Sequence, residues 1–177
     1  MAPISQARVR AFFERSYLAK TAPEKGKALE DLVEYVFCTI PGVRFGERDV
    51  FNEFDTEEID LAFWNNKHAR GLWFLDPLVL VECKNWSSPV SSIEVAWFIA
   101  KLRSRGLSFG ILVAANGVTG DARARTDAHS LIYEALSQQL RLIVITRQEI
   151  ELIQDTDELI ELIQRKLTKL VVRGYLF

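Results

Sequence analysis

Residues 77–85 read PLVLVECKN, an apolar run that two charges interrupt near its end. Continuous apolar character is typical of a strand covered on both faces, so this stretch predicts a central strand of a sheet. Side chains alternate along a strand, which puts Glu82 and Lys84 on one face and Cys83 on the other. Charges on a core strand are costly unless they are paired or bind a metal; the simpler alternative is a strand end where both reach solvent.

The sequence on either side of this strand predicts the rest of the sheet. Helical spacing over 91–106, a buried run over 107–115, an amphipathic helix over 119–140 and a strand over 140–146 follow in order. Such alternation predicts right-handed parallel crossovers. Upstream, two stretches rich in β-forming residues predict an antiparallel hairpin joined near Asp55. The expected fold is α/β, with a mixed central sheet of an antiparallel hairpin plus parallel strands, flanked by helices.

Further helices are expected at both ends of the chain. Residues 5–19 show a helical pattern, the stretch TAPEKG reads as a break, and a second helix is expected from about Gly26 to Ile40. From Arg147 onward, apolar pairs alternate with charges at helical spacing, which predicts two short helices broken near Asp155. We expect one domain over 1–177, with a core of about 26–150, an N-terminal helix over 5–20 and C-terminal helices over 147–171.

The composition narrows the class of protein. With 177 residues, 49% of them hydrophobic and 26% charged, the chain resembles ordinary soluble globular proteins. No apolar run approaches the ~20 residues of a membrane span, and the N-terminus lacks the pattern of a signal peptide, so a cytoplasmic protein without membrane contact is expected. Cys38 and Cys83 lie in apolar stretches, which predicts buried free thiols, and no spacing suggests a zinc site.

The formal net charge of −2 hides an uneven distribution. Ten carboxylates crowd residues 30–60, where only two arginines oppose them, whereas residues 101–147 carry seven bases against three acids. A cation-binding end and an end that tolerates phosphate could therefore coexist. Lys101, Arg103 and Arg105 form a small positive cluster at a helix end, where cations also favour the helix dipole.

Asp60 strengthens the case for a site. It interrupts another apolar strand, one that is expected to lie beside the strand of Glu82 and Lys84. Three ionisable groups could then converge. Two carboxylates on adjacent strands suit Mg²⁺, which binds one or two carboxylates, several waters and substrate phosphate oxygens. A lysine beside them would favour a hydroxide or the charge that develops on phosphorus.

Three segments carry a family resemblance: GKALEDLVEYVF (26–37), EEIDLAFW (57–64) and LVLVECKNWSSPVSSIEVAWFIAKLRSRGLSFGILVAANGVTGDA (78–122). Over about residues 26–150 the chain resembles the PD-(D/E)xK nuclease superfamily, especially its Mrr-like restriction endonuclease branch. The resemblance implies a restriction-endonuclease-like fold and phosphodiester hydrolysis assisted by Mg²⁺ or Mn²⁺. It implies that Asp60 is the first metal-binding acid, Glu82 the second, Lys84 the signature lysine and Glu30 the helix glutamate of many members.

Some features depart from the commonest pattern of that branch. Ile59 stands where proline often precedes the first acid, and many Mrr-like enzymes have glutamine at the position of Glu82. An insertion that contains Trp73 and Phe74 separates the two acids. Both acids and the lysine are nevertheless present, which favours an active enzyme. The carbonyl of Cys83 is a possible further metal ligand.

Glu30 and Glu34 lie one helical turn apart, so either could be the third acid. At about 100° per residue, Glu30 borders the apolar stripe of its helix while Glu34 lies further toward solvent. This spacing favours Glu30. The alternative for both glutamates is a solvated helix face.

Tentative nucleic-acid contacts follow the strands. Asn85 and Trp86 come directly after the lysine; Trp86 could stack on a base, or it could cover the core. Thr119, with Arg123 and Arg125, could hold a phosphate at the N-terminus of the helix expected over 119–140, although a helix cap and solvated arginines are equally simple.

We therefore expect a Mg²⁺-dependent endodeoxyribonuclease of restriction or anti-phage defence. DNA is the expected partner, and a homodimer or a subunit of a larger complex is the expected assembly, because cutting two strands needs two sites. The alternatives are a catalytically inactive nucleic-acid-binding or assembly module of a defence complex, and a nuclease that acts on RNA or branched DNA.

Overall fold

The computed structural model describes residues 2–51, 58–124 and 126–174. Within them, five strands form one sheet in the order β1-β2-β3-β4-β5. The strands are β1 (Val43–Phe51), β2 (Glu58–Asn65), β3 (Leu78–Lys84), β4 (Phe109–Ala114) and β5 (Arg141–Thr146). The pairs β1–β2 and β2–β3 are antiparallel, whereas β3–β4 and β4–β5 are parallel. The predicted mixed sheet is thus confirmed; the turn expected near Asp55 lies outside the described residues.

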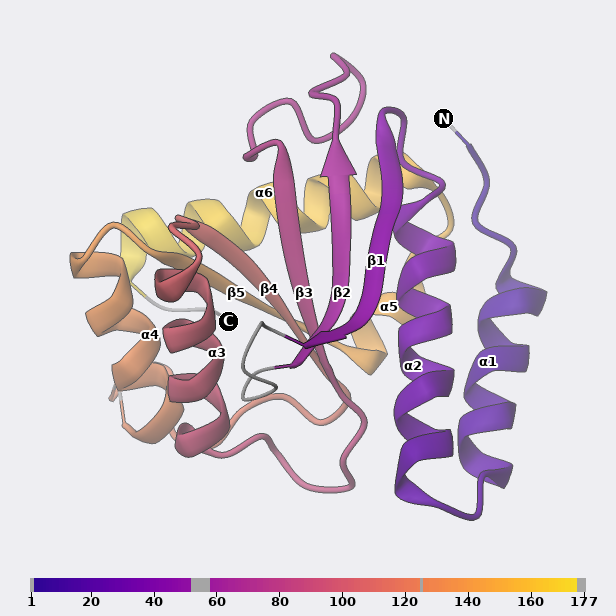
Figure 1. Ribbon diagram of the computed structural model, residues 1–177, viewed down its shortest axis with the longest axis horizontal. Helices are drawn as coiled ribbons and strands as arrows, with labels where there is room; N and C mark the ends of the chain where they lie inside the picture. Colours follow the sequence, from indigo (N-terminus) through magenta and orange to yellow (C-terminus); the bar gives the residue numbers. More distant parts are fainter. Residues whose placement is uncertain (1, 52–57, 125, 175–177) are drawn as a thin grey trace.

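Helices flank this sheet on both sides (Figure 1). They are α1 (Gln6–Leu18), α2 (Ala22–Phe37), α3 (Ser92–Ser104), α4 (Asp127–Ser137), α5 (Arg147–Leu152) and α6 (Thr156–Arg173). Figure 1 shows α1 and α2 side by side at one end, α3 and α4 together at the other, and α6 passing behind the sheet. Helices α3 and α4 are the parallel crossovers that the sequence predicted. No described helix is long and apolar enough to cross a membrane.

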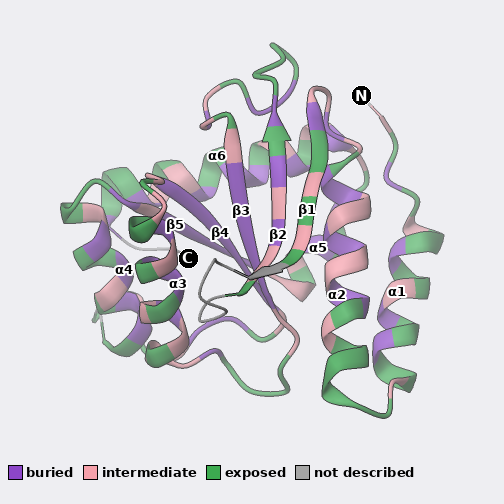
Figure 2. Ribbon diagram, in the orientation of Figure 1, coloured by how far each residue is buried: buried purple, intermediate pink, exposed green. Residues whose placement is uncertain are grey.

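Two faces of the sheet are covered by different helices. Helix α3 packs closely against β4 at Gly110, where a Cβ atom would lie only 2.5 Å from Leu102 Cδ1. On the opposite face, the ring of Phe37 in α2 stacks on Phe63 in β2 at 5.2 Å. Every residue of β4 is buried, and Figure 2 shows the core running through β3, β4 and β5. Charged groups on β3 therefore lie close to the core.

Helix α2 begins four residues earlier than predicted. Thr21 and Glu24 form a capping box, and Pro23 occupies the first turn. The stretch TAPEKG was wrongly interpreted as a break, because proline lacks an N–H that the first turn does not need. The apolar stripe of α2 is nevertheless buried as expected.

Helix α4 begins later than predicted, at Asp127 and not near Thr119. Gly120 has φ +98, and a Cβ atom there would lie 2.4 Å from the Thr126 carbonyl oxygen. The side chain of Asp121 also accepts a hydrogen bond from the Ala124 N–H at 2.6 Å. This compact turn, which includes a side-chain-to-backbone hydrogen bond, takes the place of the first helical turns that were predicted.

The break between the two C-terminal helices is confirmed, since Asp155 is the N-cap of α6. Both cysteines are free, as expected. Cys83 is buried, but the prediction of burial for Cys38 was wrong. Cys38 directly follows α2, at the end of the helix and away from its apolar stripe.

Candidate active site

The register of β2 against β3 brings the two predicted acids together. Leu61 pairs with Val81, so the antiparallel ladder continues toward Asp60 and Glu82 on neighbouring strands. At this point the Cys83 N–H donates a hydrogen bond to Asp60 Oδ2 at 2.7 Å. Glu82 is only 4% exposed. The charges do not emerge into solvent, so the simple alternative of an exposed strand end is excluded.

Lys84 bridges these carboxylates. Its Nζ lies 2.8 Å from Glu82 Oε1 and 4.0 Å from Asp60 Oδ2. Burial lowers the pKa of Lys84, but the charges of Glu82 and Asp60 outweigh it and hold the pKa above its usual value. The ammonium group is therefore protonated at neutral pH and points at both acids.

The surroundings of Asp60 disfavour the charged form of its carboxyl group. Burial raises its pKa, the charge of Glu82 raises it further, and Lys84 together with the Cys83 N–H lowers it in part. The resulting pKa is about 6. A bound cation would offset the charge of Glu82 that disfavours ionisation of Asp60.

Glu30 in α2 joins the same cluster. Burial is the main cause that raises its pKa to about 7, and the charges of Asp49 and Asp60 add to it. The side chain of Glu30 is 14% exposed, against 36% for Glu34. Helical spacing therefore predicted correctly that Glu30 is the more buried of the two glutamates. The charge of Asp60 also raises the pKa of Glu30.

Lys101 is a member of the site whose role the sequence did not show. Its Nζ lies 2.9 Å from both Oε1 and Oε2 of Glu82. The residue comes from the last turn of α3 and was interpreted only as part of a positive cluster at a helix end. The available signal was its position next to the buried Leu102, because a basic residue bordering an apolar stripe faces the sheet edge.

Arg48 in β1 is a second contributor that the sequence did not reveal. Its guanidinium pairs with Asp31, lies 2.7 Å from Glu34 Oε2 and is 3.9 Å from Glu30 Oε2. These acids all belong to α2, so one arginine ties the edge strand to the helix that carries Glu30. The sequence showed only that two arginines stand among ten carboxylates.

The donors present suit a divalent ion. Asp60 and Glu82 provide carboxylate oxygens on neighbouring strands, and Mg²⁺ takes one or two carboxylates with waters and substrate oxygens. Among the described residues, no group of three or more His, Cys, Asp or Glu side chains is arranged to hold a metal. A site built here would therefore depend on water and substrate for its remaining ligands.

Asn85 and Trp86, two of the predicted nucleic-acid contacts, differ in their surroundings. The Asn85 side-chain amide donates to Ser16 Oγ at 2.7 Å and to the Lys25 carbonyl at 2.6 Å, which ties the end of β3 to α1 and α2. Trp86 is 41% exposed, so it does not simply cover the core.

The phosphate cradle expected at Thr119 has a different geometry from the one predicted. The Thr119 N–H donates to the Val90 carbonyl oxygen at 2.9 Å, and α4 starts eight residues further on. Thr119 therefore does not lie at a helix N-terminus, and that expectation was wrong. Arg123 is exposed in the turn before α4, and Arg125 lies outside the described residues.

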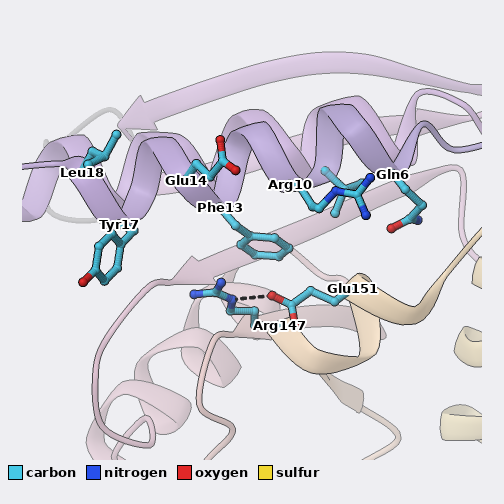
Figure 3. A pocket seen from close by; sticks show the side chains of 9 residues that line it. Gln6, Arg10, Phe13, Glu14, Tyr17, Leu18, Arg147 and Glu151 are labelled. Carbon is cyan, nitrogen blue, oxygen red and sulfur yellow. Dashed lines mark hydrogen bonds and ion pairs between the residues drawn. The ribbon is translucent and has the colours of Figure 1, made fainter.

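A surface pocket of about 580 Å³ lies elsewhere, between α1 and α5 (Figure 3). In it, Arg147 pairs with Glu151 at 2.8 Å and its guanidinium stacks 4.3 Å from the centre of the Phe13 ring. The residues lining this pocket include none of the acidic cluster. The ionisable groups of the candidate active site therefore lie elsewhere, where β2 begins and β3 ends.

Comparison with known proteins agrees with this geometry. A protein-family model described as Restriction endonuclease (Mrr_cat) matches residues 24–163, and the chain belongs to this family. No curated protein matches the sequence. This membership assigns the chain to the nucleases, implies DNA as the substrate, and agrees with the restriction-endonuclease-like fold. Helix α1 lies outside the matched residues.

Proposed function

We propose that the protein is a Mg²⁺-dependent endodeoxyribonuclease, for which Mn²⁺ can substitute, in restriction or anti-phage defence. The observation that carries this proposal is the position of Lys84, whose ammonium lies 2.8 Å from Glu82 and 4.0 Å from Asp60 on neighbouring strands. The family match supports the nuclease class, and the buried acids support a divalent ion as cofactor.

Each residue of the cluster has a distinct task in this proposal. Asp60 and Glu82, with the Cys83 carbonyl as a possible further ligand, hold the ion, which supplies Lewis acidity toward the phosphate when bound. Lys84 orients the attacking water and stabilises the negative charge that develops on the phosphate oxygens. Glu30, whose pKa is raised to about 7, accepts a proton from water near neutral pH.

The remaining tentative contacts are proposed to form or support the DNA-binding surface. Trp86 stacks on a base beside the scissile phosphate, and Asn85 holds the end of β3 against α1 and α2. Thr119 and Arg123, from the loop before α4, contact backbone phosphates, as does Arg125. We further propose that the chain forms one nuclease domain and acts as a homodimer or within a larger complex, because a double-strand cut needs two sites.

Cleavage of supercoiled plasmid DNA in Mg²⁺, with a chelator control, tests the proposal. Asp60→Ala, Glu82→Ala and Lys84→Ala should each reduce cleavage by about 100-fold or more. Glu161→Ala removes an exposed carboxylate from α6 and should cut like the wild type. Robust cleavage by all three site variants would show that the assignment is wrong. Parallel assays with RNA and with a four-way DNA junction decide the substrate.

One observation favours the inactive module as a second candidate. Lys101 and Lys84 both pair with Glu82, so the carboxylate is neutralised without any metal. A binding or assembly module would keep this arrangement and bind DNA without cutting it. Calorimetric titration with Mn²⁺ separates the two, because only the nuclease should bind the ion in a way that Glu82→Ala abolishes.

A further inference from the structure

Lys101 and Glu82 form the most complete ion pair of the site. The ammonium group of Lys101 lies 2.9 Å from each carboxylate oxygen of Glu82 and so caps the open end of that carboxylate. The Glu82 side chain is 6% exposed and that of Lys101 is 14% exposed, which limits competition by water. Charge-assisted hydrogen bonds of this kind are stronger than neutral ones, and loss of one partner would leave a buried charge uncompensated.

The acceptor capacity of Glu82 is almost filled. An ionised carboxylate has about four lone-pair positions, two on each oxygen. Lys101 takes one on each oxygen, and Lys84 takes a further one on Oε1 at 2.8 Å. One position, on Oε2, remains, so a divalent ion that binds Glu82 through Oε1 or through both oxygens displaces one of the two lysines.

Lys101 is the lysine that can leave. Lys84 is shared between Glu82 and Asp60 and follows Glu82 on the same strand. Lys101 comes from α3 and reaches Glu82 through a flexible four-carbon side chain. The charges explain why a lysine leaves at all: Asp60 and Glu82 balance Lys84 and Lys101, and a divalent ion added among them repels the ammonium groups.

We propose that Lys101 is the counter-ion of Glu82 in the metal-free protein and that a divalent cation displaces it on binding. Lys101 thereby sets the metal concentration at which the site loads. It is a positioning residue, since it keeps Glu82 in place between β3 and α3 before the ion arrives. This inference rests on the proposed function, because it requires that Glu82 binds a metal.

Calorimetric titration of chelator-treated full-length protein with Mn²⁺ tests this inference without any cleavage assay. Lys101→Met keeps the length of the side chain and removes its charge. It should bind Mn²⁺ about tenfold more tightly, as expected when a charged hydrogen-bonded competitor is removed. Arg103→Met removes a charge from an exposed position of the same helix and should bind like the wild type. Lys101→Arg retains the competing charge and should show no tightening.

The titration distinguishes failure of the proposed role of Lys101 from failure of the proposed metal site. Glu82-dependent binding by the wild type with equal or weaker binding by Lys101→Met would overturn the role of Lys101 and leave the proposed nuclease intact. No Glu82-dependent binding by any variant would overturn the proposed metal site itself, and the inference with it.

A crystal of the wild type soaked in Mn²⁺ gives a second readout that does not depend on how the variants fold. The proposal expects the ammonium of Lys101 to lie beyond hydrogen-bonding distance of Glu82 once the ion is bound. Retention of both Lys101 bonds beside a bound ion would overturn it.

Discussion

The backbone N–H of Cys83 donates a 2.7 Å hydrogen bond to the carboxylate of Asp60. This bond fixes the acid at the point where β2 and β3 meet the candidate active site. Asp60 therefore has two separable roles. Its oxygen accepts a hydrogen bond that joins the two strands, and its negative charge can bind a metal. Burial raises the pKa of Asp60 to about 6, so the charge is held at a cost to stability.

Substitution at Asp60 separates these two properties. Asp60→Asn retains an acceptor oxygen for Cys83 but removes the charge, so at pH 8 it should be at least as stable as the wild type. Its cleavage should fall on the order of 10³-fold, the loss expected when several kcal/mol of metal-assisted stabilisation disappear. Chemical denaturation and plasmid cleavage measure the two effects.

Asp60→Ala is the matched comparison. It leaves the Cys83 N–H without its acceptor, which should lower the free energy of unfolding by about 1–3 kcal/mol. Equal stability of the Asn and Ala variants would show that the bond to Cys83 contributes little to the fold.

Replacement of Lys84 tests how the ammonium group acts. Lys84→Met should reduce the cleavage rate about 10²-fold, because a donor aimed at the developing charge is lost. DNA affinity in the absence of metal should change little, since Lys84 is paired with the buried acids. Single-turnover kinetics and a gel-shift titration measure both quantities. A variant that binds DNA poorly but cuts at the normal rate once saturated would assign Lys84 to binding.

The strand pattern of the sequence, together with the strand order and the family resemblance, predicted three residues of this site. Asp60, Glu82 and Lys84 were predicted to converge because alternation along neighbouring strands depends only on local spacing, and the structure brings them together. The mixed sheet and the parallel crossovers were predictable for the same reason.

The two other cations of the cluster could not be predicted in this way. Lys101 reaches Glu82 only because α3 packs across β3 and β4, which is a tertiary relationship. Arg48 reaches α2 after an irregularity in the ladder between Phe45 and Glu47, and a shift of register changes which side chains share a face. The start of α4 was missed because the turn at Gly120 depends on a contact with Thr126.

The raised pKa of Glu30 predicts a specific dependence of stability on pH. The folded protein holds the proton of Glu30 up to about pH 7, whereas an unfolded glutamate releases it near 4.5. Between these values the folded state binds more protons, so the contribution of Glu30 to stability falls as the pH rises. Urea denaturation in a chelator should show Glu30→Gln close to the wild type at pH 4 and more stable than it at pH 8.

Glu161→Gln provides the control for this measurement, because Glu161 is exposed on α6 and should show no such difference. The comparison of each variant with the wild type at the same pH removes the contribution of other groups. If Glu30→Gln gained no stability between pH 4 and pH 8, the carboxyl group would not experience the burial and the charge of Asp60 that the structure shows.

Arg48 should stabilise the fold and position Glu30 at the same time. Its side chain is 15% exposed and pairs with Asp31 and Glu34 at the edge of the sheet. Arg48→Met leaves these acids crowded on α2 and should lower the free energy of unfolding by about 2 kcal/mol, as when one partner of a partly buried ion pair is removed.

Arg15→Met is the matched control for Arg48→Met. Arg15 also pairs with Asp31 but is 51% exposed, so its removal should lower the free energy of unfolding by less than about 1 kcal/mol.

The pH profile of cleavage distinguishes a positioning role of Arg48 from a purely stabilising one. The guanidinium of Arg48 lowers the pKa of Glu30, so Arg48→Met should shift the rising limb of that profile to higher pH. Arg15→Met should leave the limb in place. An unshifted limb in Arg48→Met, together with reduced stability, would restrict Arg48 to holding β1 against α2.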